Sequence, residues 1–146
     1  GILPISFVAG RDDVIGTLTP GSEGSTFGGY PLASVVGIYA IKALVEENLA
    51  DNALVKGKQL MDGLNIIKND FPDKIKEVRG KGLLTAFEMF DEPHLDGHHI
   101  SVALLNQGIY AKETHHTTIR LAPALTINEM QVNNLLDGVR TVVKEL

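Results

Sequence analysis

The chain has 146 residues, 44% of them hydrophobic, and its 13 basic and 18 acidic side chains give a formal net charge of −5. This length and apolar content allow a folded core and argue against global disorder. Mild acidity without blocks of like charge argues against a nucleic-acid or membrane-surface role. The sequence has no cysteine, which excludes disulfides and thiolate chemistry. We expect a reducing compartment: the cytoplasm, or the mitochondrial matrix if the source is eukaryotic.

The first fifty residues read as part of a larger α/β unit. Residues 2–9 form an apolar, β-branched run that predicts a short strand. A glycine-rich loop follows, and Pro31 is suited to the first turn of a helix that extends to about Glu47. That helix is apolar on nearly all sides, which predicts burial or an interface, yet it is too short to span a bilayer. Because the sequence opens in what reads as the middle of a strand, we expect an internal fragment.

From Asp51 onward the periodicity predicts helix, strand, strand, helix, strand, strand, helix. Asp51 is the expected N-cap of the first helix, Gly108 the left-handed cap of the second, and Thr126 with Glu129 the capping box of the third. Helices covering a small sheet make an α+β layer. We therefore divide the chain into a tail at 1–50 and a small α+β domain at 51–146.

The segment RGKG at residues 79–82 is predicted to be the turn between the first two of these strands. Arg79 and Lys81 could bind an anion on composition alone. We interpret them instead as a tight structural connection.

The loop GSEGSTFGGYP at residues 21–31 concentrates glycines and hydroxyls directly before the apolar helix. It is neither a P-loop nor a dinucleotide fingerprint. Its backbone N–H groups and hydroxyls could form a nest for an anion, or the segment could be a plain connector built from turn formers. The residues alone favour the connector.

Three segments resemble one enzyme family. GSEGSTFGGYPLAS is similar to the GxHGSTxGGNPL segment of class III aminotransferases, pyridoxal phosphate enzymes of fold type I. VRGKGLL, at 78–84, resembles the VRGKGL segment of the same enzymes. KETHHTTIRLAPALTI, at 112–127, resembles the K-x-T-H-x-x-T-I-R-F-A-P-P-L segment of the ornithine aminotransferases among them. The segments occur in the family's order and cover essentially the whole chain. The resemblance implies the small C-terminal α+β domain of a fold type I transferase, preceded by the tail of its large domain.

The resemblance assigns roles to two sites. In the family the serine–threonine pair of the glycine loop, here Ser25 and Thr26, contacts the phosphate of pyridoxal 5'-phosphate bound by the neighbouring subunit, which implies a homodimer with composite active sites. Arg120 matches the arginine that binds the substrate α-carboxylate, a role that suits the bidentate guanidinium. The alternative for Arg120 is an ordinary surface arginine. Glu23 and Tyr30 depart from the family, which has His and Asn there.

The histidines could suggest a metal site. We reject this hypothesis because they do not follow the spacing of known metal-ligand motifs. Neighbouring histidines in an extended chain point in opposite directions and cannot easily share one ion. We expect solvated loop residues. They are His94, His98, His99, His115 and His116.

The resemblance implies that the parent protein moves the δ-amino group of ornithine to 2-oxoglutarate. The lysine that forms the Schiff base lies upstream of Gly1 in the family, so we expect these 146 residues alone to be inactive. Two alternatives stay open: another class III aminotransferase, acting on acetylornithine or 4-aminobutyrate, and a non-catalytic interaction domain that keeps the fold without the cofactor.

Overall fold

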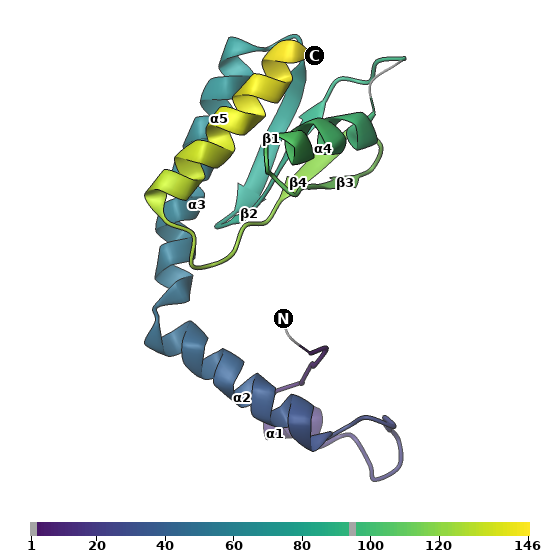
Figure 1. The fold of residues 1–146 in the computed structure, drawn as a ribbon. Coiled ribbons are helices and arrows are strands. Elements are labelled where there is room, and N and C mark those ends of the chain that lie inside the picture. The colour runs from purple at the N-terminus through teal and green to yellow at the C-terminus, as the bar shows by residue number, and fades with distance from the viewer. Residues whose placement is uncertain (1–2, 94–95) are drawn as a thin grey trace. The chain divides into compact units, whose positions relative to one another are not determined.

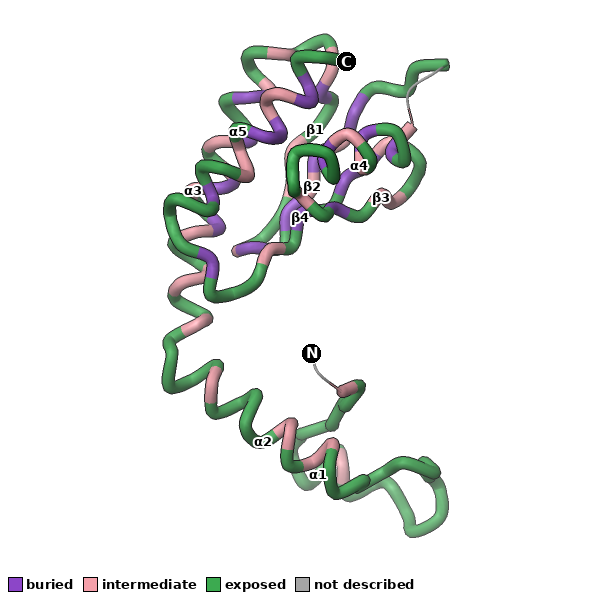
Figure 2. The backbone as a smooth tube through the Cα atoms, viewed as in Figure 1, coloured by how far each residue is buried: buried purple, intermediate pink, exposed green. Residues whose placement is uncertain are grey.

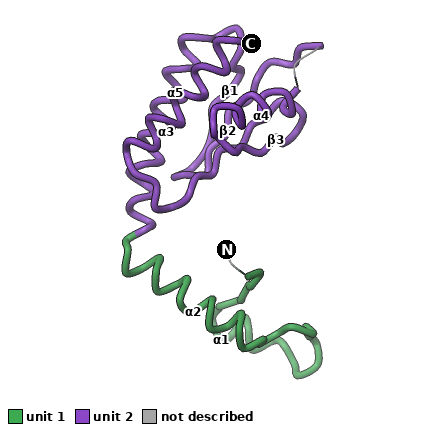
Figure 3. Tube along the Cα trace, viewed as in Figure 1, with its two compact units in different colours: residues 1–48 green, residues 49–146 purple. Residues whose placement is uncertain are grey.

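The computed structural model describes residues 3–93 and 96–146, and the chain divides into two compact units, Gly1–Asn48 and Leu49–Leu146 (Figure 3). Each unit is described by itself.

The second unit is an α+β layer of helices on a small sheet, as predicted, and the sheet is antiparallel (Figure 1). Its strands follow the order β1-β2-β4-β3, and every neighbouring pair is antiparallel. The helices are α3 (Leu49–Asp70), α4 (Gly97–Asn106) and α5 (Glu129–Glu145), and the strands are β1 (Ile75–Lys81), β2 (Leu84–Met89), β3 (Lys112–Thr114) and β4 (Thr118–Leu121). From α3 onward the chain therefore follows the helix and strand order that its periodicity predicts.

The core of this unit lies between the sheet and its helices (Figure 2). Phe87 on β2 and Ile119 on β4 face each other in register and are both fully buried. Leu60 and Leu64 of α3 and Val139 of α5 are also fully buried in the same cluster. Alternation along the strands then places the intervening side chains on the opposite face, which we call the open face of the sheet.

The hairpin between β1 and β2 corrects one prediction. Arg79, Gly80 and Lys81 belong to β1, so the turn is made by Gly82 and Leu83 rather than by the whole RGKG segment. Gly82 has a φ of +56°, a conformation that glycine adopts without strain. Helix α3 also approaches the turn closely here, because a Cβ on Gly57 would lie 2.2 Å from the carbonyl carbon of Gly82.

The helix ends confirm one predicted cap and correct two. Gly108 follows α4 with a φ of +77°, as expected. Helix α3 begins at Leu49, so Asp51 lies in its first turn and is not its N-cap. The capping box of α5 is formed by Asn128 and Gln131, whose side chains and backbone N–H groups bond reciprocally, and not by Thr126 and Glu129.

The first unit consists of α1 (Asp12–Ile15), α2 (Pro31–Glu46) and their connections. Helix α2 begins at Pro31, as predicted. The predicted strand at 2–9 is wrong over its described part, since residues 3–9 form no strand. Ile2 lies outside the described residues. A strand needs a hydrogen-bonding neighbour, and this unit contains none within residues 3–48. No helix of the described residues is long and apolar enough to cross a membrane.

Candidate functional site

Arg120 lies on the open face of the sheet. Its neighbours on β4, Ile119 and Leu121, are buried in the core, so the alternation of the strand directs Arg120 to the exposed side. Its partners across the sheet are Ala86 on β2 and Lys112 on β3.

An open groove of about 420 Å³ runs over this face. Three cationic side chains line it, those of Arg79, Lys81 and Arg120. Ala86, which lies between Arg79 and Arg120 in the sheet register, contributes only a methyl group. The groove is therefore basic and has space between the two arginines, which suits an anionic ligand.

The two arginines differ in their partners. Arg79 Nη1 lies 2.8 Å from Glu77 Oε2 and 2.7 Å from Glu88 Oε2. Lys76 Nζ lies 2.7 Å from Glu88 Oε1. Hydrogen bonds from Lys76 and Arg79 hold the pKa of Glu88 below its ordinary value. Within residues 3–93 and 96–146, Arg120 has no ion-pair partner, so its fork is available to a carboxylate.

Ser25 and Thr26 lie in a tight turn of the first unit. The Gly28 N–H donates to Ser25 O at 3.1 Å, and the Tyr30 N–H donates to Phe27 O at 3.1 Å. Gly29 has a φ of +71°, which this turn requires and which favours glycine. The turn leaves Ser25 and Thr26 exposed at its surface.

These two residues fit a phosphate. Among the described residues neither hydroxyl has a hydrogen-bond partner, whereas the Ser22 hydroxyl nearby donates to Thr19 O at 2.7 Å. A phosphate accepts several hydrogen bonds, and hydroxyls supply them without a competing negative charge. Ser25 and Thr26 belong to the first unit and Arg120 to the second.

The histidines correct an argument from the sequence. His98 and His99 lie in helix α4, and His115 and His116 have φ values of +48° and +64°, so neither pair is extended. His99 bonds to the N-cap of its helix, since its N–H and its Nδ1 lie 2.9 and 2.8 Å from Asp96 Oδ1. His94 lies outside the described residues. No group of three metal-ligating side chains comes together in the described part of the chain.

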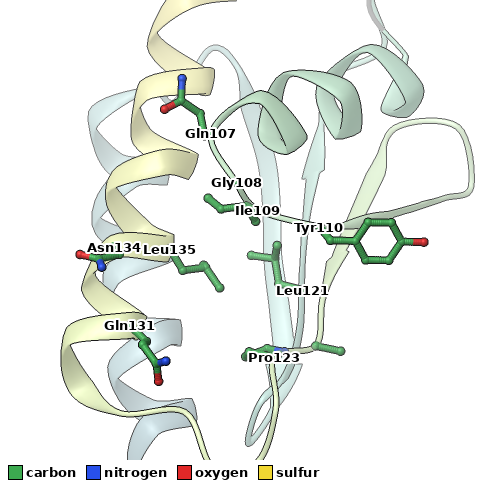
Figure 4. Close-up of a pocket in the computed structure, with 10 residues that line it drawn as sticks. Gln107, Gly108, Ile109, Tyr110, Leu121, Pro123, Gln131, Asn134 and Leu135 are labelled. Atoms are coloured by element: carbon green, nitrogen blue, oxygen red, sulfur yellow. The ribbon is translucent and has the colours of Figure 1, made fainter.

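A second pocket, of about 440 Å³, was not predicted (Figure 4). Amides of Gln107, Gln131 and Asn134 line it together with apolar side chains such as Ile109 and Leu135. It contains no cationic group, so it does not suit an anionic substrate as the groove does.

Comparison with known proteins places this geometry in a family. Residues 1–143 match the aminotransferase class-III family. The ornithine aminotransferase of Emericella nidulans is 41% identical over 149 residues, covering 100% of this chain and 32% of its own length. The chain therefore belongs to the class-III aminotransferases, and it spans about a third of that relative.

Solved structures give the same fold. The acetylornithine aminotransferase from Elizabethkingia anophelis matches with a TM-score of 0.86 and 34% identity, covering 93% of this chain and 34% of that one. An ornithine aminotransferase from Toxoplasma gondii, with PLP at partial occupancy in its active site, matches with a TM-score of 0.83 and 36% identity over 92% of this chain and 32% of that one. The fold is that of the PLP-dependent transferases of fold type I, and PLP is the cofactor of the family.

Proposed function

We propose that the chain is the C-terminal part of an ornithine aminotransferase that transfers the δ-amino group of ornithine to 2-oxoglutarate, giving glutamate semialdehyde and glutamate. The geometry of Arg120 is the observation that supports the proposed binding of the substrates. It is a free guanidinium on a basic groove, within a segment that resembles the ornithine enzymes. Both substrates carry a carboxylate, which a planar fork binds through two hydrogen bonds.

The cofactor side of the proposal rests on Ser25 and Thr26. Their unpaired hydroxyls and the glycines that follow would bind the phosphate of pyridoxal 5'-phosphate held by the partner subunit of a homodimer. Bound pyridoxal phosphate supplies the electron sink for the carbanion that transamination requires. Two parts of this chain would therefore bind anions. Ser25 and Thr26 would bind the cofactor phosphate, and Arg120 would bind the substrate carboxylate.

The proposal places the Schiff-base lysine outside these 146 residues, in a segment upstream of Gly1. Proton transfer at the substrate carbon would depend on that lysine, so we expect the chain alone to show no transaminase activity. We expect activity from a full-length protein that joins this chain to such a segment.

Substrate turnover tests the proposal. The full-length protein should consume ornithine with 2-oxoglutarate and form pyrroline-5-carboxylate, the cyclised form of glutamate semialdehyde. The second candidate is acetylornithine, favoured by the similarity to the Elizabethkingia anophelis enzyme. Turnover of acetylornithine with no turnover of ornithine would replace the first substrate by the second. Turnover of neither, with the cofactor bound, would contradict both.

A variant tests the role of Arg120. Arg120→Lys keeps the positive charge and loses the fork, so the KM for both ornithine and 2-oxoglutarate should rise about tenfold or more. Steady-state kinetics of the full-length protein measures this. An unchanged KM for both substrates would make Arg120 an ordinary surface residue.

A further inference from the structure

Arg79 joins three strands on the open face of the sheet. Its Nη1 atom donates to Glu77 on its own strand β1 and to Glu88 on β2, at 2.8 and 2.7 Å. Its Nη2 atom donates to the hydroxyl of Thr118 on β4, at 3.3 Å. The residue that the sequence assigns to a turn therefore bridges the sheet from β1 to β4.

These contacts make Arg79 a poor candidate for a second substrate-binding cation. One of its terminal nitrogens already faces two carboxylates, and Lys76 completes a cluster of two cations and two carboxylates. Formal charge in this cluster is balanced. An incoming carboxylate would have to displace Glu77 or Glu88 to reach the Arg79 fork.

The position of Thr118 connects this cluster to Arg120. Thr118 precedes Arg120 by two residues on β4, so both side chains point to the same face. Thr118 is 4% exposed, and it pairs in register with Glu88, the partner of Arg79. Arg79 itself pairs with Ala86, which pairs in turn with Arg120. Arg79 bonds to Thr118, and Ala86, which lies between the two arginines in the register, lines the open groove beside Arg120.

We propose that Arg79 is a positioning residue for Arg120: it ties β4 to the β1–β2 hairpin through Thr118 and keeps the groove over Ala86 clear for the substrate carboxylate. This inference rests on the proposed carboxylate-binding role of Arg120. It assigns a part in substrate binding to the RGKG segment, which the sequence alone presents as purely structural. A fork held in one orientation binds a carboxylate better than one on a strand that can shift.

Steady-state kinetics of full-length variants tests the proposal. In Arg79→Met, the KM for ornithine and for 2-oxoglutarate should rise about tenfold, with kcat changed by at most about twofold, because binding geometry is lost and the chemistry is not. Lys76→Met is the matched control. It removes the same charge from the same partner, Glu88, but among the described residues Lys76 makes no hydrogen bond to β4, so both KM values should stay at the wild-type level.

Thr118→Val removes the hydroxyl without any change of charge at a site where valine has a similar shape. It should raise KM in the same direction as Arg79→Met, and the double variant should be no worse than Arg79→Met alone, because both act through one contact. This arm keeps the test decisive if Arg79→Met fails to fold. In Arg79→Lys, the ion pair with Glu88 should restore the melting temperature while KM stays raised, since lysine cannot reach both partners.

Two results would overturn the proposal: a lowered melting temperature in Arg79→Met with both KM values unchanged, or an equal rise of KM in Lys76→Met. Failure of the proposed carboxylate-binding role of Arg120 is a separate outcome. It appears as an unchanged KM in Arg120→Lys. A raised KM in Arg120→Lys with normal values in Arg79→Met and Thr118→Val would refute only the role of Arg79.

Discussion

The two units of the chain differ in how far they bury their own apolar side chains. Among its described residues the second unit buries seventeen hydrophobic residues, nine of them at 0% exposure. In the first unit no residue between 3 and 48 is buried, and helix α2 exposes large apolar side chains along its length, Ile38 by 54% and Tyr39 by 66% among them. One unit therefore carries its own core, and the other carries surface that suits a partner.

This difference shows that stability and function are distributed differently along the chain. Burial of apolar surface is the main favourable contribution to folding, so most of the stability of the chain lies in its second unit. The first unit contributes a turn with two exposed hydroxyls and an uncovered apolar helix. These are features of a binding surface, and they agree with the proposed homodimer.

The largest expected effect is the loss of a core side chain in the second unit. Phe87 is fully buried at the centre of the sheet, so Phe87→Ala should lower the free energy of unfolding by about 3–5 kcal/mol. Ile38→Ala, in the first unit, should change it by no more than about 0.5 kcal/mol in the isolated chain. Urea denaturation of both variants measures the contrast. Similar losses in the two variants would mean that the first unit also has a core.

The next largest effect concerns the cofactor. Thr26→Ala in the full-length protein should weaken pyridoxal phosphate binding by about 1.5–3 kcal/mol, through one lost hydrogen bond to a charged group. Ser22→Ala, in the same loop, is the control, because the Ser22 hydroxyl is already bonded to a backbone carbonyl. Fluorescence titration of the apoenzyme gives both affinities. Equal affinities in Thr26→Ala and the wild type would remove Thr26 from the phosphate site.

A smaller effect tests the corrected capping box. Asn128→Ala should destabilise the second unit by about 1 kcal/mol, because an N-terminal N–H of α5 loses its acceptor. Thr126→Ala, at the cap that the sequence suggests, should have almost no effect. Thermal unfolding of the two variants decides between the two positions. A greater loss in Thr126→Ala would contradict the observed cap.

The smallest effect is a pH dependence from the ionic cluster on the open face. The pKa of Glu88 is lowered from its usual 4.5, so its contribution to stability is complete above that value and is lost as pH falls through the lowered pKa. Wild type should exceed Glu88→Gln in stability near neutral pH, and the difference should disappear in strong acid. Urea midpoints across this range measure it. A difference that persists in acid would point to packing instead of charge.

Much of the second unit could be predicted from its sequence, because its helices and strands repeat apolar residues at the period of the element. The capping box could not be placed with certainty. The same capping pattern occurs twice, two residues apart, in Thr126 with Glu129 and in Asn128 with Gln131. The start of α5 depends on which residues pack into the core, and Ile127 and Val132 are the buried ones. Local sequence cannot contain that information.

The candidate site was predicted in part. That Arg120 faces away from the core could be predicted, because the apolar residues Ile119 and Leu121 flank it on the strand. The role of Arg79 did not, because its two flanking glycines suggest a turn, and only the pairing of Gly80 with Thr85 places the segment in a strand. The bond from Arg79 to Thr118 spans 39 positions and depends on the strand order β1-β2-β4. No local pattern in the sequence indicates such a contact.

The most direct test is a crystal structure of the full-length homodimer with pyridoxal phosphate and an unreactive amino acid analogue. We expect a phosphate oxygen within hydrogen-bond distance of Ser25 or Thr26 from the opposite subunit, and the analogue's carboxylate on the Arg120 guanidinium over Ala86. A phosphate bound away from the glycine loop, together with a carboxylate held by residues outside the groove, would contradict the assignment of both sites.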